Sequence, residues 1–250
     1  MYIYLTYLLT FGLSSLYCYI DDNLKYDKNF SLELKKKQYE DILPLVTVNS
    51  FFFIPLLCIP YETILISNFN LYYSILTLFI SFILIDPLFW ICHRIMHIPI
   101  LYKWSHKIHH KYKKSVGMEA LYLHWFDLYF GNIIPLYLPM MLFNLDLYSH
   151  ILWTVIIVSN TVLVHGNKIE NYHSDHHLYF KFNYGSAIYT DKVMDTVYEL
   201  KRDKINTMVG QDEKNIINLN KNRISLEETR KKETRKKETS KCAEVYQCYA

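Results

Sequence analysis

Histidine is the residue type whose spacing indicates chemistry in this sequence. Eight of the eleven histidines fall into three short clusters: His93 and His97; His106, His109 and His110; and His173, His176 and His177. The first cluster reads HxxxH, and the other two read HxxHH. On a helix, spacings of three and four residues place side chains on one face, so each cluster can direct two or three imidazoles toward a common point. The sequence therefore predicts a metal site.

The number of imidazoles predicts two metal ions. A structural zinc site takes four protein ligands and a catalytic zinc site takes three, so eight histidines are too many for one ion. Neutral imidazole binds Fe, Zn, Cu and Ni, and affinity alone does not choose iron over zinc. For an all-imidazole site in a membrane protein, non-haem di-iron is the hypothesis that we favour.

Long uncharged blocks predict the elements that must position these histidines. The expected membrane spans are Met1–Ile20, Leu43–Pro60, Leu71–Cys92, 126–143 and 148–165. Pro55 interrupts the second block, and Asp86 is the only charge in the third. The alternative is a soluble all-helical protein with a buried hairpin. We expect an all-α integral membrane protein with about four to five transmembrane helices and a cytosolic-side cap of helical histidine boxes around a dimetal site.

Lysine placement predicts the orientation. The segments Asp21–Ile42 and Ile98–Lys114 each carry five lysines, whereas Tyr61–Asn70 and Asn144–Tyr148 carry neither Lys nor Arg. The positive-inside rule places the two lysine-rich segments in the cytosol and the N-terminus in the lumen. The last two spans form a hairpin, which returns the third cluster to the side of the first two.

Charge and cysteine use limit the remaining choices. Residues 200–250 carry 13 Lys and Arg against 8 Asp and Glu, on a nearly neutral body, which gives no support for nucleic-acid binding. Five scattered cysteines predict neither a disulfide framework nor a CxxC zinc site. We divide the chain into N-terminal membrane helices with a cytosolic loop (1–70), a catalytic domain (71–200) and a charged cytosolic tail, disordered or a frayed helix (201–250).

Several motifs together resemble the fatty acid hydroxylase and sterol desaturase superfamily, over roughly Asp86–Tyr198. Besides the three boxes, Asp86-Pro-Leu-Phe-Trp-Ile-Cys-His93-Arg94 resembles the approach to box one, and His124-Trp-Phe-Asp127 resembles an HPxD segment. His165-Gly166 resembles an HxG motif, and the stretch His176 to Gly185 followed by Asp191 resembles the ending of the domain. Within the superfamily, HSDHHLYFKFNYG is most similar to sterol C-5 desaturases (lathosterol oxidases). Leu121, Trp125, Thr190 and Lys192 depart from the pattern of that group.

The resemblance, together with the clusters, assigns roles to individual residues. The expected metal ligands are His93, His97, His106, His109, His110, His165, His173, His176 and His177, with His124 as a further ligand or a hydrogen-bonding neighbour. Three carboxylates are expected to orient ligating imidazoles: Asp86 for His93 or a histidine of another box, Asp191 for the last box and Asp127 for His124. The alternative for Asp191 is a loop cap.

The resemblance also implies a reaction and its partners. It implies an O2-dependent enzyme with two non-haem Fe ions that oxidises an unactivated C–H bond of a membrane lipid, in the endoplasmic reticulum with the boxes facing the cytosol. Electrons would come from NAD(P)H through cytochrome b5 and its reductase. Sterol C-5 desaturation is the favoured reaction, and the alternatives are C-4 methylsterol oxidation and fatty acid or sphingolipid hydroxylation. A catalytically silent scaffold and a metal transporter are hypotheses of another class.

Overall fold

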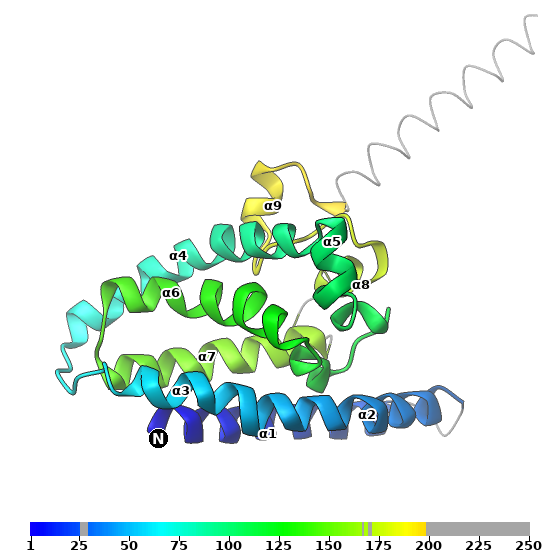
Figure 1. Ribbon diagram of the computed structural model, residues 1–250, viewed down its shortest axis with the longest axis horizontal. Coiled ribbons are helices and arrows are strands. Elements are labelled where there is room, and N and C mark those ends of the chain that lie inside the picture. Colours follow the sequence, from blue (N-terminus) through cyan, green and yellow to red (C-terminus); the bar gives the residue numbers. More distant parts are fainter. Residues whose placement is uncertain (26–29, 167, 170–171, 199–250) are drawn as a thin grey trace, which may run out of the picture. The chain divides into compact units, whose positions relative to one another are not determined.

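Five apolar helical segments form the body of the fold (Figure 1). Four are long and apolar enough to cross a membrane, Tyr2–Leu24, Leu34–Thr63, Leu71–Met96 and Leu147–His165, and a shorter one covers Asp127–Phe143. The structure is a computed structural model that describes residues 1–25, 30–166, 168–169 and 172–198. The expectation of an all-helical chain with four to five apolar helices is confirmed. The predicted tail, 201–250, lies outside the described residues.

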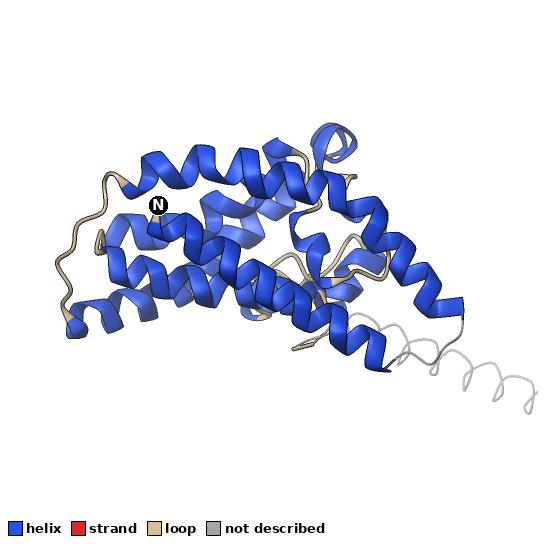
Figure 2. Ribbon diagram, turned by 90° about the horizontal axis from the view of Figure 1, so that it is seen from below, coloured by secondary structure: helices blue, strands red, loops and turns tan. Residues whose placement is uncertain are grey.

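The described residues contain helices and no strand, apart from one isolated β-bridge (Figure 2). The α-helices are α1 (Tyr2–Lys25), α2 (Phe30–Val48), α3 (Ile54–Glu62), α4 (Leu71–Met96), α5 (Pro99–Leu101), α6 (Ile134–Phe143), α7 (Leu147–His165), α8 (Tyr172–Tyr179) and α9 (Tyr189–Val193). The π-helices are η1 (Asn49–Phe53), η2 (Tyr102–His106) and η5 (Asp127–Ile133), and the 3₁₀-helices are η3 (His109–Lys111) and η4 (Gly117–Leu121). Helix α1 packs on α7 and α3, and α4 packs on α6.

The side chains of α4 are arranged as in a membrane helix. Its inner face buries the small residues Ser74, Thr77 and Ser81, whereas the large apolar side chains of Phe79 and Ile83 are exposed. Small residues let helix backbones approach closely where lipid surrounds the bundle. An apolar exterior of this kind fits a bilayer and not water.

The second segment was expected to be interrupted at Pro55, but the helix continues through this residue. The π-helix η1 precedes α3, and Pro55 sits in the first turn of α3. Proline needs no N–H partner at a helix start, and its ring collides with the carbonyl group four residues earlier in a regular helix. The wider π turn accommodates this collision, so the helical stretch runs on from Leu34 to Thr63. The same order, π-helix η5 followed by Pro135, begins α6.

The two short connections without basic residues meet at one end of the bundle. The backbone N–H of Ile66 donates to Leu145 O at 2.9 Å, and that of Leu147 donates to Ile66 O at 2.9 Å. The N-terminal amine pairs with Glu62 at this end. Asp146 caps α7 there by accepting from the backbone N–H of Ser149 at 2.9 Å.

At the other end, partly buried ion pairs tie α1 to the segment that follows α7. Lys168 contacts Asp21 and Asp22, at 2.5 and 2.7 Å, and Lys35 contacts Asp22 at 3.1 Å. The short helices α5 and α8 lie near the C-terminal ends of α4 and α7, and α9 lies beside α4 near Asp86 (Figure 1). The histidine clusters therefore lie on one side of the bundle, as the crossing pattern predicted.

Candidate metal centre

Nine imidazoles form two adjoining groups. The first group holds His93, His97, His106, His110 and His176, and the second holds His109, His165, His173 and His177. Within each group, one nitrogen per ring can be chosen so that all of them lie within 4.8 Å of one another. The rings of His110 and His177, one from each group, have centroids 4.6 Å apart. The nine strongest ligand predictions from the sequence are thus brought together.

Each HxxHH box contributes to both groups. In the second box, His106 and His110 belong to the first group and His109 to the second; in the third box, His173 and His177 belong to the second group and His176 to the first. Residues four apart share a helix face, whereas adjacent residues point about 100° apart. The expectation that a whole box points at one place therefore holds only for the residues four apart, and the intervening histidine reaches the neighbouring group.

Four rings use Nδ1 to bind an oxygen atom. The Nδ1 of His93 lies 2.8 Å from Tyr184 O, that of His165 lies 2.7 Å from Thr161 O, and that of His176 lies 2.6 Å from Phe182 O. The Nδ1 of His106 lies 2.7 Å from the Asp127 carboxylate. Because these oxygens accept, Nδ1 carries the proton in each ring and Nε2 keeps its lone pair. Histidines that bind metals are oriented in this way.

The spacing of the free nitrogens fits shared metal ions. Nε2–Nε2 distances are 3.0 Å for His106–His110, 3.2 Å for His110–His176 and 3.1 Å for His165–His173. Two nitrogens at about 2.0–2.1 Å from one ion lie about 3 Å apart at a right angle. Buried nitrogens of His93 and His177 lack a hydrogen-bond partner in the described part of the chain. Such nitrogens are costly unless something binds them.

The electrostatics of the box residues favour the neutral, ligating form of imidazole. Burial lowers the pKa of His109, His173 and His176 well below its usual value, and repulsion between neighbouring imidazoles lowers it further. Neutral imidazole is the metal-binding form. The two groups can therefore hold metal ions at neutral pH.

Asp86 and Asp191 were expected to bind imidazoles, but both carboxylates accept hydrogen bonds from the backbone of one turn. Asp86 accepts from the backbone N–H groups of Ala187 at 2.5 Å and Thr190 at 2.8 Å. Asp191 accepts from the N–H groups of Tyr184 at 2.9 Å and Gly185 at 2.8 Å, as the loop-cap alternative predicted. A Cβ atom at Gly185 would collide with the Asp86 carboxylate, so glycine lets the two carboxylates hold one turn. This backbone turn also orients His93, whose Nδ1 donates to the carbonyl oxygen of Tyr184.

His124 lies outside both groups. Its ring packs on Trp104, with centroids 5.0 Å apart, and its Nδ1 accepts from the backbone N–H of Phe126 at 3.3 Å. Asp127 was expected to orient His124, but its carboxylate accepts a hydrogen bond from His106. His150 lies at the opposite end and binds Tyr61 at 2.8 Å and Asn144 O at 2.7 Å.

Tyr184 is a site residue whose role the sequence did not reveal. Its ring centroid lies 5.1 Å from that of His97 and 5.3 Å from that of His176, and its hydroxyl accepts from Arg94 at 2.6 Å. The Asn183-Tyr184-Gly185 motif was expected only to shape a turn. The contact of Tyr184 O with His93 could not be predicted from the sequence, because every residue has a backbone carbonyl group.

A cavity of about 270 Å³ opens onto the two groups. Its lining includes His93, His106, His109, His165 and His173. Apolar side chains of α4, α6 and α7 complete the wall, among them Phe89, Leu136 and Ile157. The arrangement is a partly apolar pocket with imidazoles that could hold metal ions on one wall.

Comparisons with known proteins agree with this architecture. Residues 77–196 match the family model described as "Fatty acid hydroxylase", so this part of the chain is a domain of the fatty acid hydroxylase family. The chain is 33% identical over 142 residues to a putative methylsterol monooxygenase of Dictyostelium discoideum, covering 50% of this chain and 52% of that protein.

Two fungal proteins named Delta(7)-sterol 5(6)-desaturase are also similar. The one from Candida glabrata is 30% identical over 204 residues, covering 72% of this chain and 54% of that protein. The one from Aspergillus fumigatus is 36% identical over 128 residues, covering 46% and 35%. The chain thus spans about half the length of the curated relatives that it matches first. No solved structure matches it.

Proposed function

We propose that the protein is a membrane-bound, non-haem di-iron oxidoreductase that uses O2 to oxidise an unactivated C–H bond of a lipid. The observation that carries the proposal is the pair of adjoining imidazole groups beside a partly apolar pocket between apolar helices. Iron would supply the O2-activating redox chemistry. The family of the domain and the names of its relatives support iron and a lipid substrate.

The residues of the chain would hold and orient the iron ions. The first group offers five imidazoles to one ion and the second offers four to the other. Asp127 draws the Nδ1 proton of His106 toward its charge, which makes Nε2 a stronger ligand. Carbonyl groups of Thr161, Phe182 and Tyr184 fix three more rings.

The particular reaction that we propose is sterol C-5 desaturation. It is supported by the likeness of the last box to sterol C-5 desaturases and by the two fungal relatives. In a desaturation, O2 accepts four electrons, two from the C–C unit that loses two hydrogens and two from a donor, and two waters form. C-4 methylsterol oxidation is the second candidate, because the Dictyostelium relative bears that name.

We further propose that the two donor electrons come from NAD(P)H through cytochrome b5 and its reductase at the cytosolic face of the endoplasmic reticulum. The lysine-rich Ile98–Lys114 segment follows the first box directly and offers positive charge to an acidic donor. The orientation rests on the positive-inside rule.

Sterol analysis in a yeast strain without its own C-5 desaturase tests the reaction. Expression of the full chain should convert a Δ7 sterol into a 5,7-diene, detected by mass spectrometry. Oxidation at the 4-methyl group would instead favour the second candidate. No oxidised lipid of any kind from protein that retains iron would contradict the proposed enzyme.

Metal analysis tests the two-ion site. Purified protein should hold about two iron atoms per chain, and His176→Ala and His109→Ala, one from each group, should each lose about one. His124→Gln is the matched control, because His124 lies outside both groups, and it should keep both. Full occupancy in the two box variants would overturn the assignment.

A further inference from the structure

The fold contains a second cavity, of about 320 Å³, next to the metal pocket. Asn132, Leu136, Ile157 and Thr161 line both cavities. The two cavities therefore adjoin at these four residues. Side chains of α1, α3, η4, η5, α6 and α7, together with Leu123, form the rest of the second cavity, and none of the nine grouped histidines lines it.

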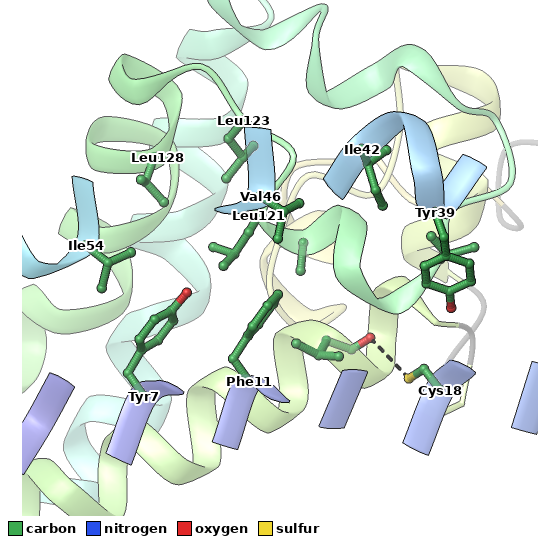
Figure 3. Packing of buried hydrophobic residues seen from close by; sticks show 13 residues of the cluster. Tyr7, Phe11, Cys18, Tyr39, Ile42, Val46, Ile54, Leu121, Leu123 and Leu128 are labelled. Carbon is green, nitrogen blue, oxygen red and sulfur yellow. Dashed lines mark hydrogen bonds between the residues drawn. The ribbon is translucent and has the colours of Figure 1, made fainter. Parts of the chain in front are cut away.

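The second cavity is lined mainly by apolar side chains. Figure 3 shows apolar side chains of its wall, among them Phe11, Ile54 and Leu121, pointing toward one another from different elements. The hydroxyl groups of its three tyrosines already have protein partners: Tyr7 binds Ser50 at 3.0 Å, Tyr61 binds His150 at 2.8 Å and Tyr137 binds Thr154 at 3.1 Å. A long alkyl group would fit this lining, whereas a polar group deep in the cavity would find the three tyrosine hydroxyls already hydrogen-bonded.

The metal pocket, in contrast, carries an amide group without a partner. Asn160 lies within the apolar helix α7, lines the metal pocket and is exposed, and its side chain makes no hydrogen bond to any described residue. Asn132, across the pocket on η5, makes one long hydrogen bond, 3.4 Å to Asp127 O. A polar side chain within a membrane helix is costly unless it finds a partner, and it often marks a substrate site.

We propose that one lipid occupies both cavities, with its polar group at Asn160 and Asn132 and its hydrocarbon tail in the second cavity. The carbon that is oxidised then lies next to the imidazoles, within a few bonds of the polar group. This inference rests on the proposed oxidation of a lipid and defines the substrate class further. A 3-hydroxysterol oxidised near its hydroxyl group fits, whereas oxidation in the middle or at the far end of a long chain does not.

A cavity-filling substitution tests the position of the tail. Val158→Phe adds a ring to the second cavity, which Val158 lines without reaching the metal pocket. Turnover of a Δ7 sterol should fall about tenfold or more, while that of an analogue without the alkyl side chain should stay the same. Val155→Phe, on the same helix at a position 39% exposed and lining neither cavity, should change neither rate. An equal loss with both sterols in Val158→Phe at unchanged iron content would overturn the placement of the tail.

Loss of the amide tests the position of the polar group. Asn160→Leu should lower kcat/KM for the 3-hydroxysterol about tenfold or more, and should not lower it for the 3-deoxy analogue, at unchanged iron content. Equal effects on the two sterols would overturn the role of Asn160. The position of oxidation in the product distinguishes this proposal from the proposed function. A lipid oxidised far from its polar group would agree with lipid oxidation but would contradict the placement of the polar group at Asn160 and Asn132.

Discussion

His106 Nδ1 and Asp127 Oδ2 lie 2.7 Å apart, and both residues are buried. The ring nitrogen donates to the carboxylate, which leaves Nε2 free to bind a metal in the first group. A carboxylate, a histidine and the other imidazoles of the first group are thus aligned within the helical cap. The pair joins π-helix η2 to π-helix η5. The latter forms the first part of the shorter apolar segment, Asp127–Phe143.

We expect Asp127→Asn to weaken metal binding about 10–100-fold, because asparagine can still accept from His106 Nδ1 but lacks the charge that strengthens the ligand. Chelator titration of the purified protein measures the change. Asp146→Asn is the matched control, since Asp146 is equally buried but caps α7 at the opposite end, where asparagine is also a good cap. Equal metal affinity in all three proteins would contradict a role for the Asp127 charge.

We expect Gly131→Ala to reproduce the effect of Asp127→Asn while leaving the carboxylate in place. A Cβ atom at residue 131 would collide with Asp127 Oδ1, so the carboxylate must turn away from His106. Reduced metal retention with little change in expression is the expected result. If the double variant with Asp127→Asn loses much more metal than either single one, the glycine acts through another contact.

We expect Asp86→Asn to loosen the turn that orients His93. Asparagine brings an N–H donor toward the N–H groups of Ala187 or Thr190, which now share a carboxylate, so at least one buried donor loses its acceptor. Metal should be lost and the midpoint of thermal unfolding should fall together, because a turn is destabilised and no ligand is removed. Loss of iron without a change in thermal stability would instead favour a direct electrostatic action on the ligands.

The sequence predicted which histidines gather and where the apolar segments lie better than it predicted the partners that orient the imidazole rings. Spacing on a helix identified eight box histidines, and uncharged length identified the five apolar segments, because both are local properties. Each of Asp86, Asp127 and Asp191 was expected to orient a particular imidazole, and each has a different partner in the structure, because that partner depends on how distant segments fold together. For the same reason, no local pattern indicated that His109 and His110, adjacent in the chain, belong to different groups.

We expect the histidine end of the bundle to be cytosolic. The boxes lie at this end, and the positive-inside rule places both lysine-rich segments in the cytosol. Asn29-Phe30-Ser31, whose first residue lies outside the described residues, is a glycosylation acceptor sequence within the first of these segments. Asn29 should therefore carry no glycan in microsomes. An acceptor sequence on a tag placed before Met1 should be glycosylated, which serves as the positive control. Glycan on Asn29 would reverse the orientation.

Glu119 gives the protein a predicted pH dependence that is separate from the metal site. Its carboxyl group is fully buried and accepts from Gln38 Nε2 at 2.9 Å and from the backbone N–H of Val116 at 3.3 Å. Burial raises its pKa from 4.5 to about 8, although these hydrogen bonds oppose the shift. Between these two values the folded protein keeps a proton that the unfolded chain releases, so the free energy of unfolding falls as the pH rises.

We therefore expect the wild-type melting temperature in detergent to fall between about pH 6 and about pH 8, and to fall less in Glu119→Gln. Glutamine keeps an oxygen to accept from Gln38 and Val116 but carries no charge at any pH, so it should be the more stable variant at the alkaline end. Glu40→Gln, at an exposed glutamate of α2, should retain the wild-type slope. The same slope in Glu119→Gln as in the wild type would show that ionisation of Glu119 does not control stability in this range.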